Sequence, residues 1–114
     1  MCQKIMFNDG LSLNKDSLEE IIRKVEQWGE DKGIENIDKQ YIKGVEEYSE
    51  LGREIVRGRY KSTEAKDAIG DTVVVLIILS KLLGFNLYEC LEHAWGEIKN
   101  RTGKTIKGSF VKDE

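Results

Sequence analysis

Hydrophobic positions recur three and four residues apart along most of this chain, which is the spacing of an amphipathic helix face. Capping residues precede these stretches, glycines follow them, and no proline interrupts them. The pattern predicts four helices, over residues 17–32, 38–57, 63–83 and 86–102. It assigns residues 104–114 to a short extended or loop-like tail.

Two of these helices begin with a capping-box pattern, in which two side chains three residues apart satisfy each other's backbone amides. Ser17 with Glu20 provides the first pair, and Asn86 with Glu89 provides the second. Four helices without a predicted sheet make the fold class all-α, most simply a four-helix bundle. We expect a single domain over residues 1–114.

The third helix is apolar on nearly every side between residues 73 and 83. Such a helix has to be buried all round, and three companion helices from one short chain cover it poorly. We therefore expect a second subunit to complete the bundle, in a homodimer or homotetramer. One apolar side of the second helix is also expected to face the bundle; it consists of Ile42, Val45, Tyr48, Leu51 and Ile55.

The composition is that of an ordinary soluble domain, since 39% of the 114 residues are hydrophobic and 34% are charged. A net charge of −3 argues against a surface that coats a nucleic acid polymer. No signal segment is evident, and the longest apolar run is far shorter than the roughly 20 residues that span a bilayer. Cys2 and Cys90 form no metal-binding motif. These features predict a cytoplasmic protein with no membrane partner.

Four carboxylates lie on the second and third predicted helices. On a helical wheel, Asp71 shares a stripe with the apolar Val75, and Asp67 lies one turn before it. Glu47 lies at the edge of the apolar side of the second helix, and Glu50 follows on the next turn. If the two helices pack antiparallel, these four side chains face one another.

Carboxylate oxygens without histidine are the ligands that suit Mg²⁺ or Mn²⁺. An ionised carboxylate aimed into a bundle is costly unless it is paired or bound to a metal. Glycines at Gly44, Gly52 and Gly70 allow the backbones to approach closely near this cluster. The alternative is that the acidic residues form an ordinary solvated surface. A di-iron site fits less well, because it needs Glu-x-x-His pairs, and no glutamate stands three residues before His93.

Two stretches carry a more specific pattern, QYIKGVEEYSEL at residues 40–51 and DAIGDTVVVLIIL at residues 67–79. They resemble the MazG-like all-α nucleoside triphosphate pyrophosphohydrolases. The closing EIKNRTGKTIKGSFVK is similar to the end of a short branch of that family, found in phages and Firmicutes. The family pattern is EExxE, a spacer and ExxD, and this chain departs from it because Ala68 stands where the first residue of ExxD is expected.

The resemblance implies Mg²⁺-dependent hydrolysis of a ribo- or deoxyribonucleoside triphosphate to the monophosphate and pyrophosphate, a reaction that serves nucleotide-pool housecleaning. It assigns Glu47, Glu50 and Asp71 as metal ligands. Glu46 or Asp67 is then the base that orients the attacking water, and Asp67 also stands beside the missing glutamate.

Basic residues near the end of the chain correspond to the family's phosphate contacts, and Trp28 is a candidate for stacking on the base. The candidate substrate-binding residues are therefore Lys99, Asn100, Arg101, Lys104 and Trp28. Gln40 and Lys43 are weaker candidates beside the metal-binding helix. Simpler interpretations stay open, because cations are favoured at helix C-termini by the dipole and aromatic residues usually belong to a core.

Two other functions also stay open. The chain is then a non-catalytic oligomeric helical module, or a regulator that binds nucleotide through a degenerate acidic site without turnover. Ala68 favours the first of these, the non-catalytic module. Pyrophosphate release from a panel of nucleotides with Mg²⁺ separates them from the enzyme.

Overall fold

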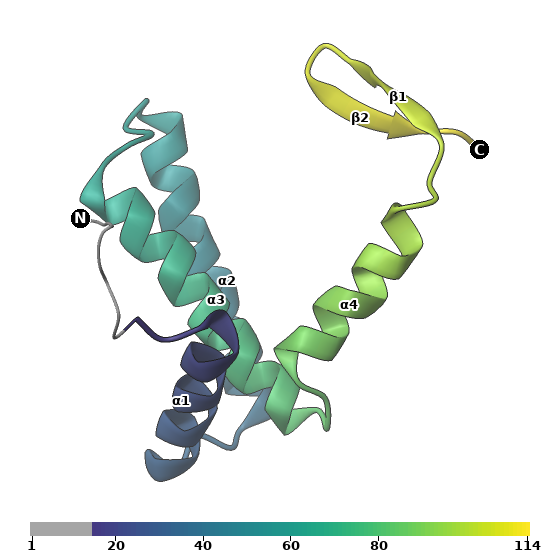
Figure 1. Cartoon of the computed structure of the whole chain (residues 1–114). Helices are drawn as coiled ribbons and strands as arrows, with labels where there is room; N and C mark the ends of the chain where they lie inside the picture. Colours follow the sequence, from purple (N-terminus) through teal and green to yellow (C-terminus); the bar gives the residue numbers. More distant parts are fainter. Residues whose placement is uncertain (1–14) are drawn as a thin grey trace.

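The computed structural model describes residues 15–114, which are mostly helical with a small two-stranded sheet at the C-terminal end (Figure 1). Its elements are α1 (Leu18–Asp31), α2 (Ile37–Val56), α3 (Thr63–Leu82), α4 (Leu87–Ile98), β1 (Gly103–Ile106) and β2 (Ser109–Lys112). The four predicted helices are confirmed, and the first three end within one residue of the expected positions. Residues 1–14 of the predicted domain, with Cys2, lie outside the described residues.

The predicted capping boxes are present at both helices. The Ser17 hydroxyl accepts from the amide of Glu20 at 3.1 Å, and the Glu20 carboxylate accepts from the amide of Ser17 at 2.7 Å. Asn86 and Glu89 make the same reciprocal pair at the start of α4. The expected end of α4 is wrong, because Lys99 caps the helix and residues 99–102 connect it to the sheet.

The helix α3 is central to the described chain, since α1, α2 and α4 each pack against it and α2 does so most extensively. The helices α2 and α3 lie antiparallel and side by side (Figure 1): the first half of α2 meets the second half of α3 at Gly44 and Val75. A Cβ at Gly44 would lie 3.2 Å from Cγ1 of Val75, so this glycine permits the close approach. Gly52 and Gly70 have no such neighbour within 4 Å, and the corresponding prediction is wrong for them.

The side of α2 that faces α3 is largely polar, and here the sequence-based expectation is wrong. The buried or half-buried residues of α2 are Gln40, Gly44, Glu47, Leu51 and Glu54. Of the predicted apolar side only Leu51 is partly covered, while Ile42, Val45, Tyr48 and Ile55 are all about half exposed or more. Val75 of α3 therefore packs against Gly44, between the buried polar residues Gln40 and Glu47. The apolar side of α2 is left uncovered in the single chain.

Uncovered apolar residues continue on the other helices. On α3, Val75, Ile77 and Ile78 are buried, but Ile69 and Leu76 are exposed. The helix α4 is bent by 99° from α3 and points away from the other helices (Figure 1). An exposed apolar stripe runs along it, formed by Tyr88, Leu91, Trp95 and Ile98. Contiguous apolar patches of this kind commonly mark interfaces, and the completing subunit stays a prediction.

The C-terminal tail forms an antiparallel hairpin, in which Lys104 pairs with Val111 and Thr105 with Phe110. Lys107 and Gly108 make its two-residue turn, with φ of 51° and 83°. Two successive residues with positive φ are the requirement of the tight turns that match the twist of a hairpin. The hairpin stands beyond the end of α4, away from α1–α3 (Figure 1).

Between residues 15 and 114, no helix taken alone has the length and apolar character needed to cross a membrane. The consecutive helices α3 and α4 reach that length and composition only when they are counted together across their bend.

Candidate functional site

A cavity of about 600 Å³ lies between the end of α1, the α1–α2 connection, α2 and α3. Val74, Val75 and Ile78 of α3 form the apolar part of its wall. The polar part comes from the α1–α2 connection and from both helices, and consists of Glu35, Asn36, Lys39, Gln40, Lys43, Glu47 and Asp71. Its size suits a small-molecule site, which commonly combines an apolar wall with a few convergent polar groups.

Glu47 is the buried carboxylate of this cavity, with 8% of the residue exposed. Its oxygen Oε2 lies 3.1 Å from Nζ of Lys43, one turn earlier on α2. This hydrogen bond raises the pKa of Lys43. More than half of the Lys43 side chain is exposed, so its ammonium can move into solvent, but the carboxylate that it leaves is buried and then needs another cation. Glu47 is therefore a site where one cation can be exchanged for another.

Asp71 reaches the same cavity from α3. It lies one turn before Val75, and the antiparallel packing brings it to the wall that also contains Glu47. The residue is exposed rather than enclosed in the bundle. The cavity thus brings together two of the three predicted metal ligands, together with Trp28 and the weaker candidates Gln40 and Lys43.

The other predicted acidic residues do not line this cavity. Glu46, Glu50 and Asp67 are exposed on their helices. Among residues 15–114, no group of three or more Asp, Glu, His or Cys side chains is close enough to hold a metal ion. The expected gathering of four carboxylates is therefore not seen. Glu46, assigned as a base and not one of these four, is kept out of the cavity by helix geometry, since neighbouring residues diverge by about 100° and Glu46 cannot share the direction of Glu47.

Ala68 lies where the pattern of the resemblance expects a glutamate, and only 2% of it is exposed. This position faces the interface of α2 and α3, so a longer acidic side chain there would point into the helix pair. Asp67 is exposed one residue away and points elsewhere. Asp67 therefore does not supply a carboxylate in the direction that Ala68 occupies.

The basic candidates lie far from the cavity of their own chain. Lys99, Asn100 and Arg101 follow the last turn of α4, and Lys104 lies on β1, all exposed and beyond the outward-pointing helix (Figure 1). Trp28 differs from them, because it lines the cavity with Glu47 and Asp71 while half of it stays exposed.

A second buried glutamate was missed in the sequence. Glu54 is 5% exposed and lies two turns after Glu47 on the same side of α2. It accepts from Nε and Nη2 of Arg59 at 2.9 and 2.7 Å, and from the hydroxyl of Ser62 at 2.8 Å. These hydrogen bonds lower its pKa from 4.5 to about 2. A signal existed, since Ser62 caps α3 and Arg59 lies in the connection just before it.

The comparisons with known proteins give one match of interest. Over 67 residues the chain is 39% identical to an uncharacterized 18.2 kDa protein encoded in the rep–hol intergenic region of Haemophilus phage HP1. The match covers 56% of this chain and 40% of that protein, so the chain spans less than half of the relative's length. No family model matches the chain, and no solved structure matches it.

Proposed function

We propose that this chain is a Mg²⁺-dependent nucleoside triphosphate pyrophosphohydrolase that releases pyrophosphate and a nucleoside monophosphate. The observation that carries the proposal is the cavity itself, where the buried Glu47 of α2 and Asp71 of α3 meet beside Lys39 and Lys43. Carboxylates and ammonium groups on one wall suit a substrate that arrives as a metal complex of a polyphosphate.

The donor set fits Mg²⁺ in this role. Magnesium is commonly bound by one or two carboxylates, and waters and substrate phosphates supply the remaining ligands. Glu47 and Asp71 are two such carboxylates on one cavity wall. Glu50, one turn after Glu47, is the third assigned ligand, and in the single chain it is exposed. When bound, the metal neutralises the triphosphate and makes a bound water a better nucleophile.

Lys43 has two roles in the proposal. Without substrate its ammonium neutralises Glu47 at 3.1 Å. With a metal–nucleotide complex in the cavity, the ammonium would pair with the phosphates and Glu47 would be free to hold the metal. Lys39, one turn earlier on the same cavity wall, adds a second cation. The base that orients water is assigned to Glu46, next to Glu47, or to Asp67, one turn before Asp71, and both are exposed outside the cavity wall of the single chain.

We propose further that the active form is a homodimer or homotetramer. The exposed apolar sides of α2 and α4 supply the interface. The helix α4 points away from α1–α3 (Figure 1), and in such an oligomer its basic end, Lys99 to Lys104, would reach the phosphates in the cavity of a neighbouring copy. Light scattering should show an oligomer at micromolar concentration, and Leu91→Asp on α4 should dissociate it. A stable wild-type monomer contradicts this part of the proposal.

The test of the reaction is pyrophosphate release from all ribo- and deoxyribonucleoside triphosphates, with Mg²⁺ and with excess chelator. We expect release with at least one nucleotide, and none with chelator. Hydrolysis that persists undiminished in chelator refutes the metal site.

The second candidate is a nucleotide-binding regulator or a non-catalytic helical module. The observation that favours it is the Lys43–Glu47 ion pair, because a paired glutamate has no need of a metal. Nucleotide binding without pyrophosphate release would identify the regulator. Neither binding nor release would identify the structural module.

A further inference from the structure

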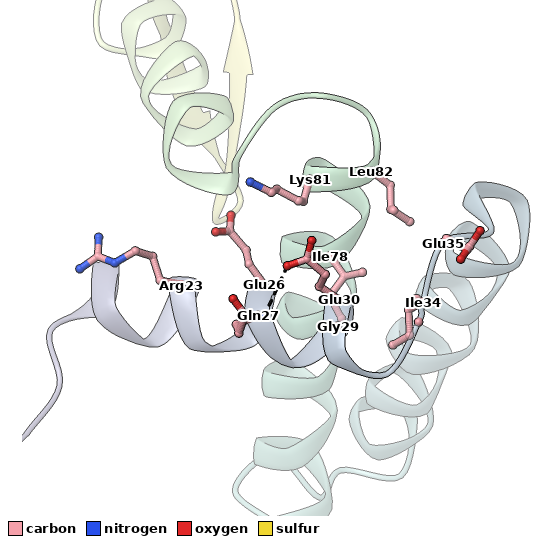
Figure 2. A pocket seen from close by; sticks show the side chains of 11 residues that line it. Arg23, Glu26, Gln27, Gly29, Glu30, Ile34, Glu35, Ile78, Lys81 and Leu82 are labelled. Carbon is pink, nitrogen blue, oxygen red and sulfur yellow. Dashed lines mark hydrogen bonds between the residues drawn. The ribbon is translucent and has the colours of Figure 1, made fainter.

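A second cavity, of about 410 Å³, lies between α1 and the end of α3 (Figure 2). Its apolar part is formed by Ile34, Ile78 and Leu82. Glu26 and Glu30 rise into it from α1, while Lys81 extends over it from α3 (Figure 2). The cavity therefore combines an apolar wall with acceptors from one helix and a cation from another.

Glu26, which lines this cavity and also a smaller one of about 290 Å³ beside Tyr88, carries an unusual atom. Its oxygen Oε2 is buried and has no hydrogen-bond partner. Within residues 15–114, every other buried side-chain nitrogen or oxygen of the buried and half-buried residues has one. A buried carboxylate oxygen without a donor is costly. A ligand that donates hydrogen bonds into the cavity would remove this cost.

Two cations stand beside Glu26 without pairing with it. Arg23 lies one turn earlier on α1, and Lys81 faces it from α3. Neither is within ion-pair distance of a carboxylate in the described part of the chain. A ligand that fits this arrangement offers adjacent donors to the carboxylate and an acceptor to a cation.

We propose that this cavity binds a guanine base, with Glu26 accepting from the ring N1–H and the 2-amino group. The proposal rests on the proposed function, because it names the base of the same nucleotide. Guanine carries two adjacent donors followed by the O6 acceptor, and O6 then lies toward Lys81 or Arg23. Adenine and cytosine place an acceptor beside their amino group, and uracil flanks its single N–H with two carbonyls. Each of these bases can therefore donate only one hydrogen bond to the carboxylate and turns an acceptor toward its other oxygen.

The position of the cavity agrees with one nucleotide spanning both sites. The two cavities share Ile78 and the residues 33–35 of the α1–α2 connection. Asp71 precedes Ile78 by seven residues, which is about 10 Å along α3. A nucleoside triphosphate can therefore place its phosphates near Glu47 and Asp71 while its base lies against Ile78 and Glu26.

This arrangement competes with stacking of the base on Trp28. Trp28 and Glu26 lie two residues apart on α1, so they point to nearly opposite sides of the helix. Trp28 lines the first cavity, and Glu26 lines the second. One base cannot contact both side chains, and the two arrangements give different results on substitution.

The test is calorimetric binding of α,β-methylene triphosphates with Mg²⁺, which avoids hydrolysis. The guanosine, inosine, adenosine, cytidine and uridine analogues are compared on the wild type, Glu26→Gln and Trp28→Ala. Asp31→Asn is the matched control, since it removes one charge from α1 outside both cavities. We expect the guanosine analogue to bind tightest to the wild type, and inosine, which lacks the 2-amino group, to bind more weakly. Glu26→Gln should weaken only the guanosine and inosine analogues, guanosine by about tenfold to a hundredfold.

Equal binding of all bases, or a loss on Glu26→Gln shared by every analogue, overturns the proposal. A base ranking that depends on Trp28 and not on Glu26 places the base in the first cavity and also overturns it. The melting temperature of Glu26→Gln, expected to equal or exceed that of the wild type, shows that the variant is folded. Pyrophosphate release without guanine preference refutes the base site alone. Glu26-dependent guanosine binding without release refutes the reaction alone.

Discussion

Glu47 and Glu54 lie seven residues apart on the same side of α2, and both are buried against α3. Their surroundings differ. Glu54 accepts three hydrogen bonds from Arg59 and Ser62, which belong to the connection that leads into α3. Glu47 has one partner, the exposed Lys43 of its own helix, and it opens on a cavity.

The difference separates a structural carboxylate from one that is free to act. Arg59 meets Glu54 with two nitrogens, a geometry that is specific and strong, and Ser62 also caps α3, so Glu54 fixes the turn between the two helices. Glu47 makes no comparable set of hydrogen bonds to a neighbouring connection. A buried carboxylate with a single ion-pair partner does not recover the full cost of leaving water. Glu47 is therefore the glutamate suited to bind an incoming cation.

The largest expected effect is on turnover. Glu47→Gln keeps the shape of the side chain but removes the charge, so it should reduce pyrophosphate release by about a hundredfold or more. Glu54→Gln makes the same chemical change two turns away and should leave the activity of the folded protein near that of the wild type. A melting curve first gives the folded fraction of each variant, and the initial rates of pyrophosphate release per folded molecule are then compared. If both variants lose activity equally, the two glutamates do not have the separate roles assigned here.

The next effect is thermal stabilisation by metal. A ligand that binds only the folded state at a hundredfold excess over its Kd adds about 2.7 kcal/mol, which corresponds to roughly ten degrees in melting temperature for a small domain. Mg²⁺ with a non-hydrolysable nucleotide should produce this shift in the wild type and in Glu54→Gln. Glu47→Gln and Asp71→Asn should cancel it. Differential scanning calorimetry measures the shift, and a wild-type curve indifferent to millimolar Mg²⁺ with nucleotide contradicts the site.

The sequence predicted the four helices and their caps because local signals determine them. Ser17 with Glu20 and Asn86 with Glu89 act within one turn, and the described structure contains both pairs. The sequence also predicted that Asp71 lies on the same helical stripe as Val75, and in the structure both residues line the cavity. Such regularities depend only on helix geometry.

The packing of α2 could not be predicted in the same way. A helical wheel ranks sides by hydrophobicity, and on that ranking Val45 and Tyr48 belong inside, yet both are exposed. Close approach at Gly44 selects the polar side instead. The hydrogen bonds of Glu54 are a second case, because they depend on how the turn at Arg59 folds back onto α2. The hairpin of the tail is a third case, because an extended or loop-like tail was predicted and the pairing of its strands depends on the two-residue turn at Lys107 and Gly108.

The smallest expected effect concerns the pH dependence of stability. Glu54→Gln should lower the melting temperature by several degrees at neutral pH, because Arg59 and Ser62 lose a charged partner. The pKa of Glu54 is lowered from 4.5 to about 2 in the folded state, so the unfolded chain takes up the proton first as the pH falls. The stabilisation by Glu54 is therefore complete above the unfolded pKa and is lost as the pH falls toward the folded value.

Melting curves of the wild type and Glu54→Gln should accordingly differ most near neutral pH and converge between about pH 4.5 and pH 2. Glu97→Gln on α4 is the control, because its carboxylate is largely exposed and, within residues 15–114, forms an ion pair with His93 alone; it should change the melting temperature little at any of these pH values. A difference between wild type and Glu54→Gln that persists unchanged at the acid end would mean that the shape of the side chain, and not its charge, holds the turn. In that case the contrast with Glu47 would rest on packing, and the exchangeable cation at Lys43 would no longer distinguish the two sites.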